Sequence, residues 1–303
     1  MIRVEPLAAD QLDAALRLVL ADPGSKRPAD DAQVAQYRRQ LAQPGVTWLG
    51  HVARRQGRIR GVTLATIFPG RTAVVMLPEP GELGIETPAQ RGTLLAVAEA
   101  LDAGALHYSQ ALLEPGARTG PQLLREAGFR RISRLAYLLH AGGAPRAESR
   151  TAPVEWRSYD DALRPLLAET IRASYRDSLD MPELAGRRPM DDVLASHQAA
   201  GEFDPALWEL ALVGEKPAGC VLLAPQFGGR LLELVYLGVV PEFRGRGVGG
   251  QLVARALEHA RRRGVTHVLV AVDVRNAPAR RLYSRFGFRP LLERDVFVRF
   301  GRT

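Results

Sequence analysis

The hydrophobic positions alternate between helix-like and strand-like spacing, and the same order of elements occurs twice along the chain. In the first half, helical spacing at residues 10–21 and 30–42 precedes strand-like runs at 47–54 and 60–68. In the second half, helical spacing near 159–175 and 190–200 precedes strand-like runs at 207–213 and 217–223. A period of roughly 150 residues is too long for a solenoid repeat and predicts a duplicated α/β domain.

The two halves also end alike. GPQLLREAGFRRISRLAYLL (120–139) and APARRLYSRFGFRPLLERDVFV (277–298) each read as a short helix, a Gly-Phe pair and an arginine-rich turn into a strand. Between the halves, AGGAPRAESRTAP (141–153) has the composition of a linker. The sequence therefore predicts an N-terminal domain over 1–140, a linker over 141–153 and a C-terminal domain over 154–303, each a mixed sheet flanked by helices.

A glycine-rich segment in the second half follows an apolar strand and precedes a helical pattern. Residues 231–240 are nearly all apolar, Pro241 ends the run, and RGRGVGG (244–250) leads into residues with helical period. The first amides of a helix lack internal acceptors, and glycines let a backbone approach a phosphate closely. Arg244 and Arg246 add positive charge. This order indicates a pyrophosphate site, and the alternative is a tight strand-to-helix turn.

A second polar segment follows the next apolar run, residues 265–274. Asn276 suits a helix cap, Pro278 a first helical turn and Gly287 a helix end. The short helix between them carries Tyr283, which could be a core aromatic.

These two segments, in this order, resemble the GNAT superfamily of acetyl-CoA-dependent N-acetyltransferases. The loop matches its Gln/Arg-x-x-Gly-x-Gly/Ala motif, the later segment matches Asn-x-x-Ala-x-x-x-Tyr-x-x-x-Gly-Phe, and the match extends over about residues 155–300. The resemblance implies two tandem α/β (α+β) GNAT-like domains with mostly antiparallel sheets, and acetyl-CoA as co-substrate. It implies CoA contacts at Leu237, Gly238, Val239, Arg244, Gly245, Arg246, Gly247, Val248, Gly249, Gly250 and Asn276.

The resemblance also implies roles in catalysis. Tyr283 would lie near the CoA sulfur and protonate the leaving thiolate. An amine nucleophile must lose a proton before it attacks, and Glu233 is the one charged residue within the apolar run. Burial would raise its pKa toward the range of a general base. The alternative for Glu233 is a strand-edge carboxylate paired with an arginine.

In this family the loop between the first two helices shapes the acceptor site. Here that loop includes Tyr175, Asp177, Asp180 and Glu183, whose carboxylates would attract a cationic amine. A solvated acidic loop is the alternative.

The first half lacks the phosphate loop. The corresponding segment, PEPGELGIETP (78–88), contains three glutamates, and the tyrosine of the later motif is missing. We therefore expect a degenerate GNAT-like domain that does not bind CoA. This layout is similar to the mycothiol synthases, a tandem branch of the family in which one half is catalytically weak or silent.

Composition and charge narrow the possible location, cofactors and partners of the protein. No apolar run could span a bilayer, the N-terminus does not resemble a signal peptide, and Cys220 is the only cysteine, so a cytoplasmic protein without metal is expected. The net charge of +8 comes from dispersed arginines, which favours a basic surface over a nucleic-acid site. The expected activity is acetyl transfer to a primary amine of a small molecule, peptide or protein by direct attack in a ternary complex. A non-catalytic acyl-CoA sensor or scaffold remains the alternative, and the oligomeric state, homodimer included, is open.

Overall fold

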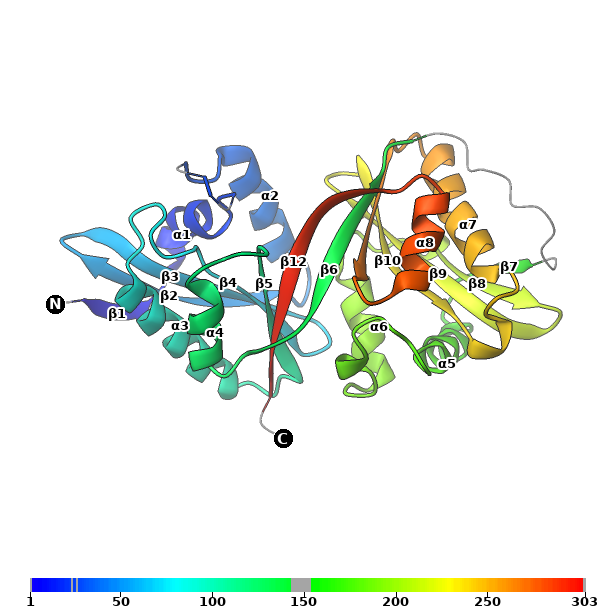
Figure 1. Cartoon of the computed structure of the whole chain (residues 1–303), viewed down its shortest axis with the longest axis horizontal. Coiled ribbons are helices and arrows are strands. Elements are labelled where there is room, and N and C mark those ends of the chain that lie inside the picture. The colour runs from blue at the N-terminus through cyan, green and yellow to red at the C-terminus, as the bar shows by residue number, and fades with distance from the viewer. Residues whose placement is uncertain (1, 23, 26, 143–153, 302–303) are drawn as a thin grey trace. The chain divides into compact units, whose positions relative to one another are not determined.

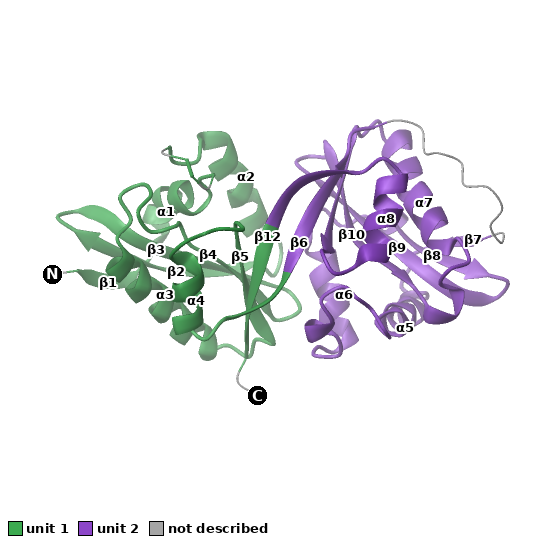
Figure 2. Cartoon of the chain, viewed as in Figure 1, with its two compact units in different colours: residues 1–133, 294–303 green, residues 134–293 purple. Residues whose placement is uncertain are grey.

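The computed structural model describes residues 2–22, 24–25, 27–142 and 154–301, so most of the expected linker, residues 143–153, lies outside the described residues. The chain forms two compact units, one of residues 1–133 with 294–303 and the other of residues 134–293 (Figure 2). Each unit is a sheet with helices on its faces (Figure 1). The α/β class with a tandem fold is confirmed.

Unit 1 begins with a helix pair and a meander of strands. Its strands are β1 (Arg3–Pro6), β2 (Thr47–Arg55), β3 (Arg58–Phe68), β4 (Thr72–Met76) and β5 (Tyr108–Leu113). Its helices are α1 (Leu12–Val19), α2 (Asp31–Leu41), α3 (Thr87–Asp102) and α4 (Gly120–Glu126), with a 3-10 turn at Ala9–Gln11. Helices α1 and α2 pack on one face of this sheet, and α3 and α4 pack on the other.

Unit 2 repeats this order. Its strands are β7 (Glu155–Ser158), β8 (Trp208–Val213), β9 (Lys216–Gln226), β10 (Leu231–Val239) and β11 (His267–Asp273). Its helices are α5 (Arg164–Ser174), α6 (Met190–Gln198), α7 (Val248–Arg262) and α8 (Ala277–Arg285), with 3-10 turns at Pro182–Leu184, Pro205–Leu207 and Pro241–Phe243. Helices α5 and α6 cover one face of the sheet, and α7 and α8 cover the other.

The strand pairing is the same in both units. Strands β1 to β4 pair antiparallel in sequence order, as do β7 to β10. The next pair, β4–β5 or β10–β11, is parallel, because a helix connects its two strands. This shared topology confirms the internal repeat predicted from the sequence.

The last strand of each half belongs to the unit of the other half. Strand β6 (Arg130–His140) pairs antiparallel with β11, and β12 (Arg289–Phe300) pairs antiparallel with β5. Figure 2 shows both strands changing colour along their length, since each begins in one unit and ends in the other. The predicted boundaries at residues 140 and 154 therefore differ from those of the compact units. The physical reason is that the two halves exchange equivalent terminal strands, which local patterns cannot distinguish.

Strand β10 contains an irregularity that the sequence did not reveal. Leu234 pairs with Leu223 and Tyr236 with Leu222, so the register shifts between them. The extra residue reverses the side-chain alternation, as in a β-bulge. The run was expected to be buried on both faces, but several of its side chains, Glu233 and Tyr236 among them, are only half-buried.

Candidate active site

The glycine-rich segment forms a strand-to-helix turn, and α7 begins directly after it. Gly245 and Gly247 have φ values of +75° and +83°, a region that favours glycine, and α7 begins at Val248. The first amide of this helix with an acceptor is that of Gln251, which donates to the carbonyl of Gly247 at 3.2 Å. Among the described residues, no acceptor is found for the amides of Val248 to Gly250. The turn thus presents free donors at the positive end of a 15-residue helix.

Arg244 has a different environment from the one expected. Its guanidinium donates to the carbonyls of Ser174 at 2.9 Å and Arg176 at 2.7 Å, and Nε donates to Val239 at 3.1 Å. The side chain therefore ties the loop to the end of α5, and its donors are used within the protein. The guanidinium of Arg246 lies 5.8 Å from the centre of the Phe243 ring.

Strand β10 separates from β11 before either strand ends. Their pairing stops at Leu234 opposite Val270, although β10 continues to Val239. The three predicted backbone contacts, Leu237 to Val239, lie in this unpaired end, where they pair only with β9. The opening between the two strands leads directly to the start of α7, so an extended ligand could bond β10 and reach the loop amides.

Gly238 has a packing reason as well. A Cβ at this position would lie 2.5 Å from the Ser174 hydroxyl oxygen and 2.8 Å from the Tyr236 ring. The hydroxyl groups of Ser174 and Tyr236 lie 2.6 Å apart, and Ser174 donates to the carbonyl of Ile171. Tyr236 can therefore lie along the strand only because residue 238 has no side chain.

Helix α8 borders the same opening. The Asn276 side chain accepts from the amide of Ala279 at 3.2 Å, which establishes its role as helix cap. Gly249 lets α8 approach, since a Cβ there would lie 3.2 Å from Leu282. Tyr283 packs in the core with Phe288, their ring centres 5.4 Å apart. Burial, with a smaller effect of the Asp180 charge, raises the pKa of Tyr283 far above its usual range, so its hydroxyl stays protonated.

Glu233 faces the side of the sheet that α5 and α6 cover. Its neighbours Leu232 and Leu234 point into the core beneath α7, so the alternation places Glu233 on the opposite face. The β-bulge then brings Tyr236 to that face, although the two residues are three apart. Burial raises the pKa of Glu233, and a 2.7 Å hydrogen bond from Gln226 opposes that shift. The arginine partner of the alternative interpretation is not found among the described residues.

The predicted acceptor loop is anchored to the end of β11. Asp180 accepts from the amide of Asp273 at 2.8 Å, and burial raises the pKa of Asp180. Arg275 holds Glu183 with contacts of 2.7 and 2.9 Å and also contacts the buried Asp273. Glu183 is therefore already paired, and its pKa is lowered by the hydrogen bond from Arg275. Of the loop carboxylates held by β11, Asp180 therefore fits the predicted role of attracting an amine better than Glu183.

The other two predicted loop residues, Tyr175 and Asp177, have different environments. The ring of Tyr175 packs edge-on against Tyr236 with centres 5.8 Å apart. Asp177 is exposed and has a φ of +54°.

Sequence reasoning missed three side chains beside Glu233. Gln226, Tyr236 and His197 lie on the α5/α6 side, and the His197 ring centre is 5.4 Å from that of Tyr236. The bulge that aligns Tyr236 leaves no sequence signal, and His197 lies about thirty residues before β10 begins. The position of Gln226, directly before a glycine turn, was the one sequence feature that could have indicated this contact, because Gln226 pairs across the hairpin with Leu231.

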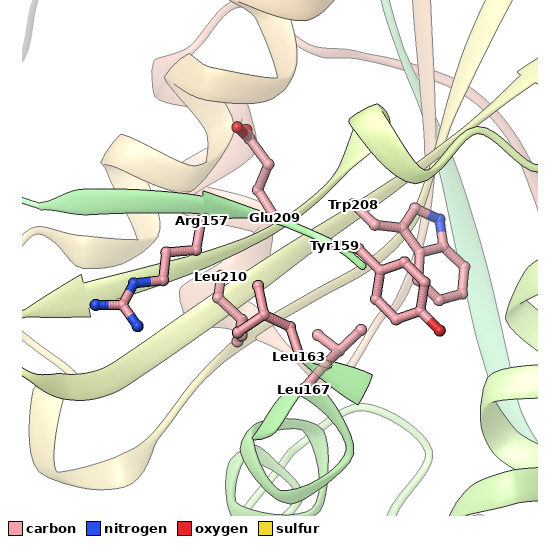
Figure 3. A pocket seen from close by; sticks show the side chains of 7 residues that line it. All are labelled: Arg157, Tyr159, Leu163, Leu167, Trp208, Glu209 and Leu210. Atoms are coloured by element: carbon pink, nitrogen blue, oxygen red, sulfur yellow. The ribbon is translucent and has the colours of Figure 1, made fainter. Parts of the chain in front are cut away.

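A buried carboxylate holds α7 against the sheet. Glu209 on β8 bonds Arg255 with two contacts of 2.7 Å and His259 with one of 2.8 Å. Burial alone would raise the pKa of Glu209, but these hydrogen bonds outweigh it and hold the pKa at about 2. In Figure 3 this carboxylate points away from Leu163 and Leu167. The shallow pocket drawn there is lined by none of the predicted site residues.

Two further expectations can be compared with the structure. Burial raises the pKa of the Cys220 thiol to about 12, as fits a core residue and not a nucleophile. Within the described ranges, no three His, Cys, Asp or Glu residues gather as a metal site would need. Across the same residues, the model contains no helix with the length and apolarity to cross a bilayer.

The equivalent region of unit 1 is closed by a carboxylate. Pairing of β4 with β5 stops at Val74 opposite Gln110, so these strands also separate. Glu79, which follows β4, accepts from the amides of Arg118 at 3.1 Å, Thr119 at 2.6 Å and Gly120 at 3.0 Å. The carboxylate thus bridges the end of β4 to the start of α4.

Comparison with known proteins gives the class. Residues 169–288 match the model of the acetyltransferase (GNAT) family. Two solved structures share the fold over the full chain. One is a GCN5-related N-acetyltransferase from Sphaerobacter thermophilus (TM-score 0.72, 17% identity, 100% of this chain and 96% of that one). The other is a tandem GNAT protein from the clavulanic acid biosynthesis pathway (TM-score 0.59, 17% identity, 100% of both chains). Residues 169–288 thus match the acetyltransferase (GNAT) family in sequence, and the full chain has the fold of a tandem GNAT protein.

Within that family, the similar curated proteins are mycothiol acetyltransferases. The one from Thermobifida fusca is 27% identical over 100% of this chain and 98% of its own length. The one from Thermobispora bispora is 38% identical, over 36% of this chain and 38% of its own length.

Proposed function

We propose that unit 2 transfers an acetyl group from acetyl-CoA to a primary amine by direct attack in a ternary complex. The observation that carries the proposal is the continuous path in one unit from the open end of β10 to the free amides at the start of α7. Amides of Val248 to Gly250 suit a diphosphate, and the edge of Leu237 to Val239 that β11 leaves unpaired suits the pantetheine arm. Asn276 can bond that arm while it caps α8, because its amide nitrogen is not used in capping.

The proton transfers are assigned to the half-buried Glu233 carboxylate and the buried Tyr283 hydroxyl. The Glu233 carboxylate takes a proton from the ammonium form of the acceptor, and its raised pKa suits that task. The free amine then attacks the thioester carbonyl, and the C–S bond breaks as the C–N bond forms. The Tyr283 hydroxyl, protonated at all ordinary pH values, gives its proton to the leaving thiolate, and the second proton that the nitrogen loses as it becomes an amide restores the tyrosine hydroxyl.

The acceptor we propose is a small-molecule amine. The relatives that match this chain over its full length or in part are named mycothiol acetyltransferases, so amines related to mycothiol are the first to test. Asp180 and Tyr175, on the loop beside Tyr236, are the residues we propose to contact it. Glu183 would contribute only if it left Arg275.

Release of free CoA thiol from acetyl-CoA, measured with an amine panel, tests the proposal. An enzyme releases thiol only when an acceptor is present, whereas an acyl-CoA sensor binds without release. Glu233→Gln should lower turnover by about 10²–10⁴-fold while acetyl-CoA affinity is unchanged, because the base acts on the acceptor. Unchanged turnover in this variant would mean that Glu233 is not the base.

We also propose that unit 1 is catalytically silent. Glu79 occupies the amides at the start of α4, which border the opening between β4 and β5. The start of α4 corresponds to the start of α8 in unit 2, so the carboxylate lies where unit 2 is proposed to contact the pantetheine arm. The remaining role of this unit is structural.

A further inference from the structure

The side chain of Gln226 is held between the proposed base and the end of α6. Its Nε2 donates to Oε2 of Glu233 at 2.7 Å and to the carbonyl of Ala200 at 2.6 Å. A primary amide has two N–H donors, so both are used. The amide therefore has one orientation, which fixes where its Glu233 contact lies.

The surrounding chain is built closely around this amide. A Cβ on Gly201 would lie 2.8 Å from Nε2 of Gln226 and 2.7 Å from the carbonyl of Pro225. The amide of Glu202 donates to that same carbonyl at 3.1 Å. The segment after α6 thus packs directly on the end of β9, and Gln226 has little freedom to turn away.

This contact determines which oxygen of the base is available. With Oε2 engaged by Gln226, Oε1 of Glu233 has no partner among the described residues and can accept a proton from the acceptor. A donor to the carboxylate also stabilises its charged form and works against burial.

Few titratable groups surround Glu233. On the face of the sheet that Glu233 occupies, β10 carries Tyr236 and α6 carries His197, whose ring lies against Tyr236, and Glu202 follows α6. The cross-strand partners on β9 and β11 are Ala224 and Leu269, which carry no charge. The Gln226 amide is therefore the polar group that stabilises the charged form of Glu233 and opposes the effect of burial on its pKa.

We propose that Gln226 is a positioning residue for catalysis, which orients the Glu233 carboxylate and stabilises its charged form. The inference rests on the proposed function of Glu233 as the base. It assigns to Gln226 an effect on the protonation of the base and not on CoA binding.

The test is the pH dependence of kcat/KM in the full-length chain. Removing the hydrogen bond in Gln226→Met disfavours the charged carboxylate, so the acid limb should move upward by about one pH unit. Gln226→Glu, which places a second carboxylate against the first, should move it further in the same direction. Acetyl-CoA affinity should stay within about twofold in both variants.

The control is a similar hydrogen bond in unit 1, between Gln122 and Glu126. Gln122 donates to Glu126 at 2.9 Å on an exposed helix surface, so Gln122→Met removes the same kind of bond away from the site. This variant should leave the acid limb unchanged. If the Met variant does not fold, the Glu variant gives the answer.

The outcomes separate the two claims. An acid limb that is absent from Glu233→Gln and shifted upward in the Gln226 variants supports the inference. A limb that depends on Glu233 but stays in place in the Gln226 variants overturns it and leaves the proposed base intact. A limb that persists in Glu233→Gln shows that Glu233 is not the base and overturns both.

Discussion

At the scale of single residues, His197 combines burial with an unpartnered ring nitrogen. Its Nε2 is buried without a hydrogen-bond partner in the described chain, and its ring lies against Tyr236. Burial, with a smaller contribution from the charge of Arg188, lowers the pKa of His197 to about 4. The ring is therefore neutral in the folded protein at pH values where an exposed histidine would be charged.

Because of His197, the protein should become less stable as the pH is lowered. Its folded pKa is below the unfolded value of about 6.5, so its contribution is present above that pH and is lost as pH falls toward about 4. At about pH 5 the loss is on the order of 2 kcal/mol. Urea unfolding of the wild type and His197→Leu, compared at about pH 7.5 and pH 5, should show a smaller loss in the variant. Burial also lowers the pKa of His51 and His140, and their effect cancels in this comparison. Equal losses in both proteins would show that His197 does not titrate in this way.

The sequence was sufficient for the residues whose roles are local. The glycine loop needs positive φ at Gly245 and Gly247, and Asn276 caps the helix that follows it, so spacing alone located both. Residues that reach the site through tertiary structure were not predictable. His197 reaches it by helix packing and Tyr236 by a bulge, and neither leaves a periodic pattern.

At the scale of elements, the exchanged strands determine which fragments of the chain can fold alone. The chain from 154 to 303 lacks β6, the partner of β11, and carries a β12 whose own partner, β5, is absent. Sequence patterns gave each half its strands in the correct order. They could not show which sheet the last strand joins, because 120–139 and 277–298 have the same pattern.

A fragment of residues 154–303 should therefore fail to bind acetyl-CoA and should aggregate, since it has an open edge at β11 and an unpaired β12. Calorimetry and size-exclusion chromatography provide the measurement. Co-expression with residues 1–142, which supply β6, is the control and should restore binding. A monomeric fragment with the acetyl-CoA affinity of the full chain would contradict the exchange.

At the scale of the whole molecule, two units of one topology differ in the contacts made beside the parallel strand pair, β10–β11 or β4–β5. Unit 2 has free amides at the start of α7, and unit 1 has Glu79 bonded across its opening. The sequence predicted the difference from three glutamates, but not that one of them bonds α4. That contact joins residues about forty apart, beyond the range of local patterns.

Titration calorimetry should show one acetyl-CoA per chain. Gly247→Val, which places a β-branched residue at a φ of +83°, should abolish that binding, because the loop cannot keep its conformation. Glu79→Gln should leave the stoichiometry at one. Residual tight binding in Gly247→Val would instead reveal a second site in unit 1.

The strand exchange also constrains how such a gene can change. Recombination at residues 141–153 would join a new C-terminal half to a β6 that had adapted to another β11. The junctions that keep each sheet whole lie instead near residues 133 and 293, inside the exchanged strands. A unit that lends a strand to its neighbour cannot be discarded in one deletion, so both copies must be inherited as a pair.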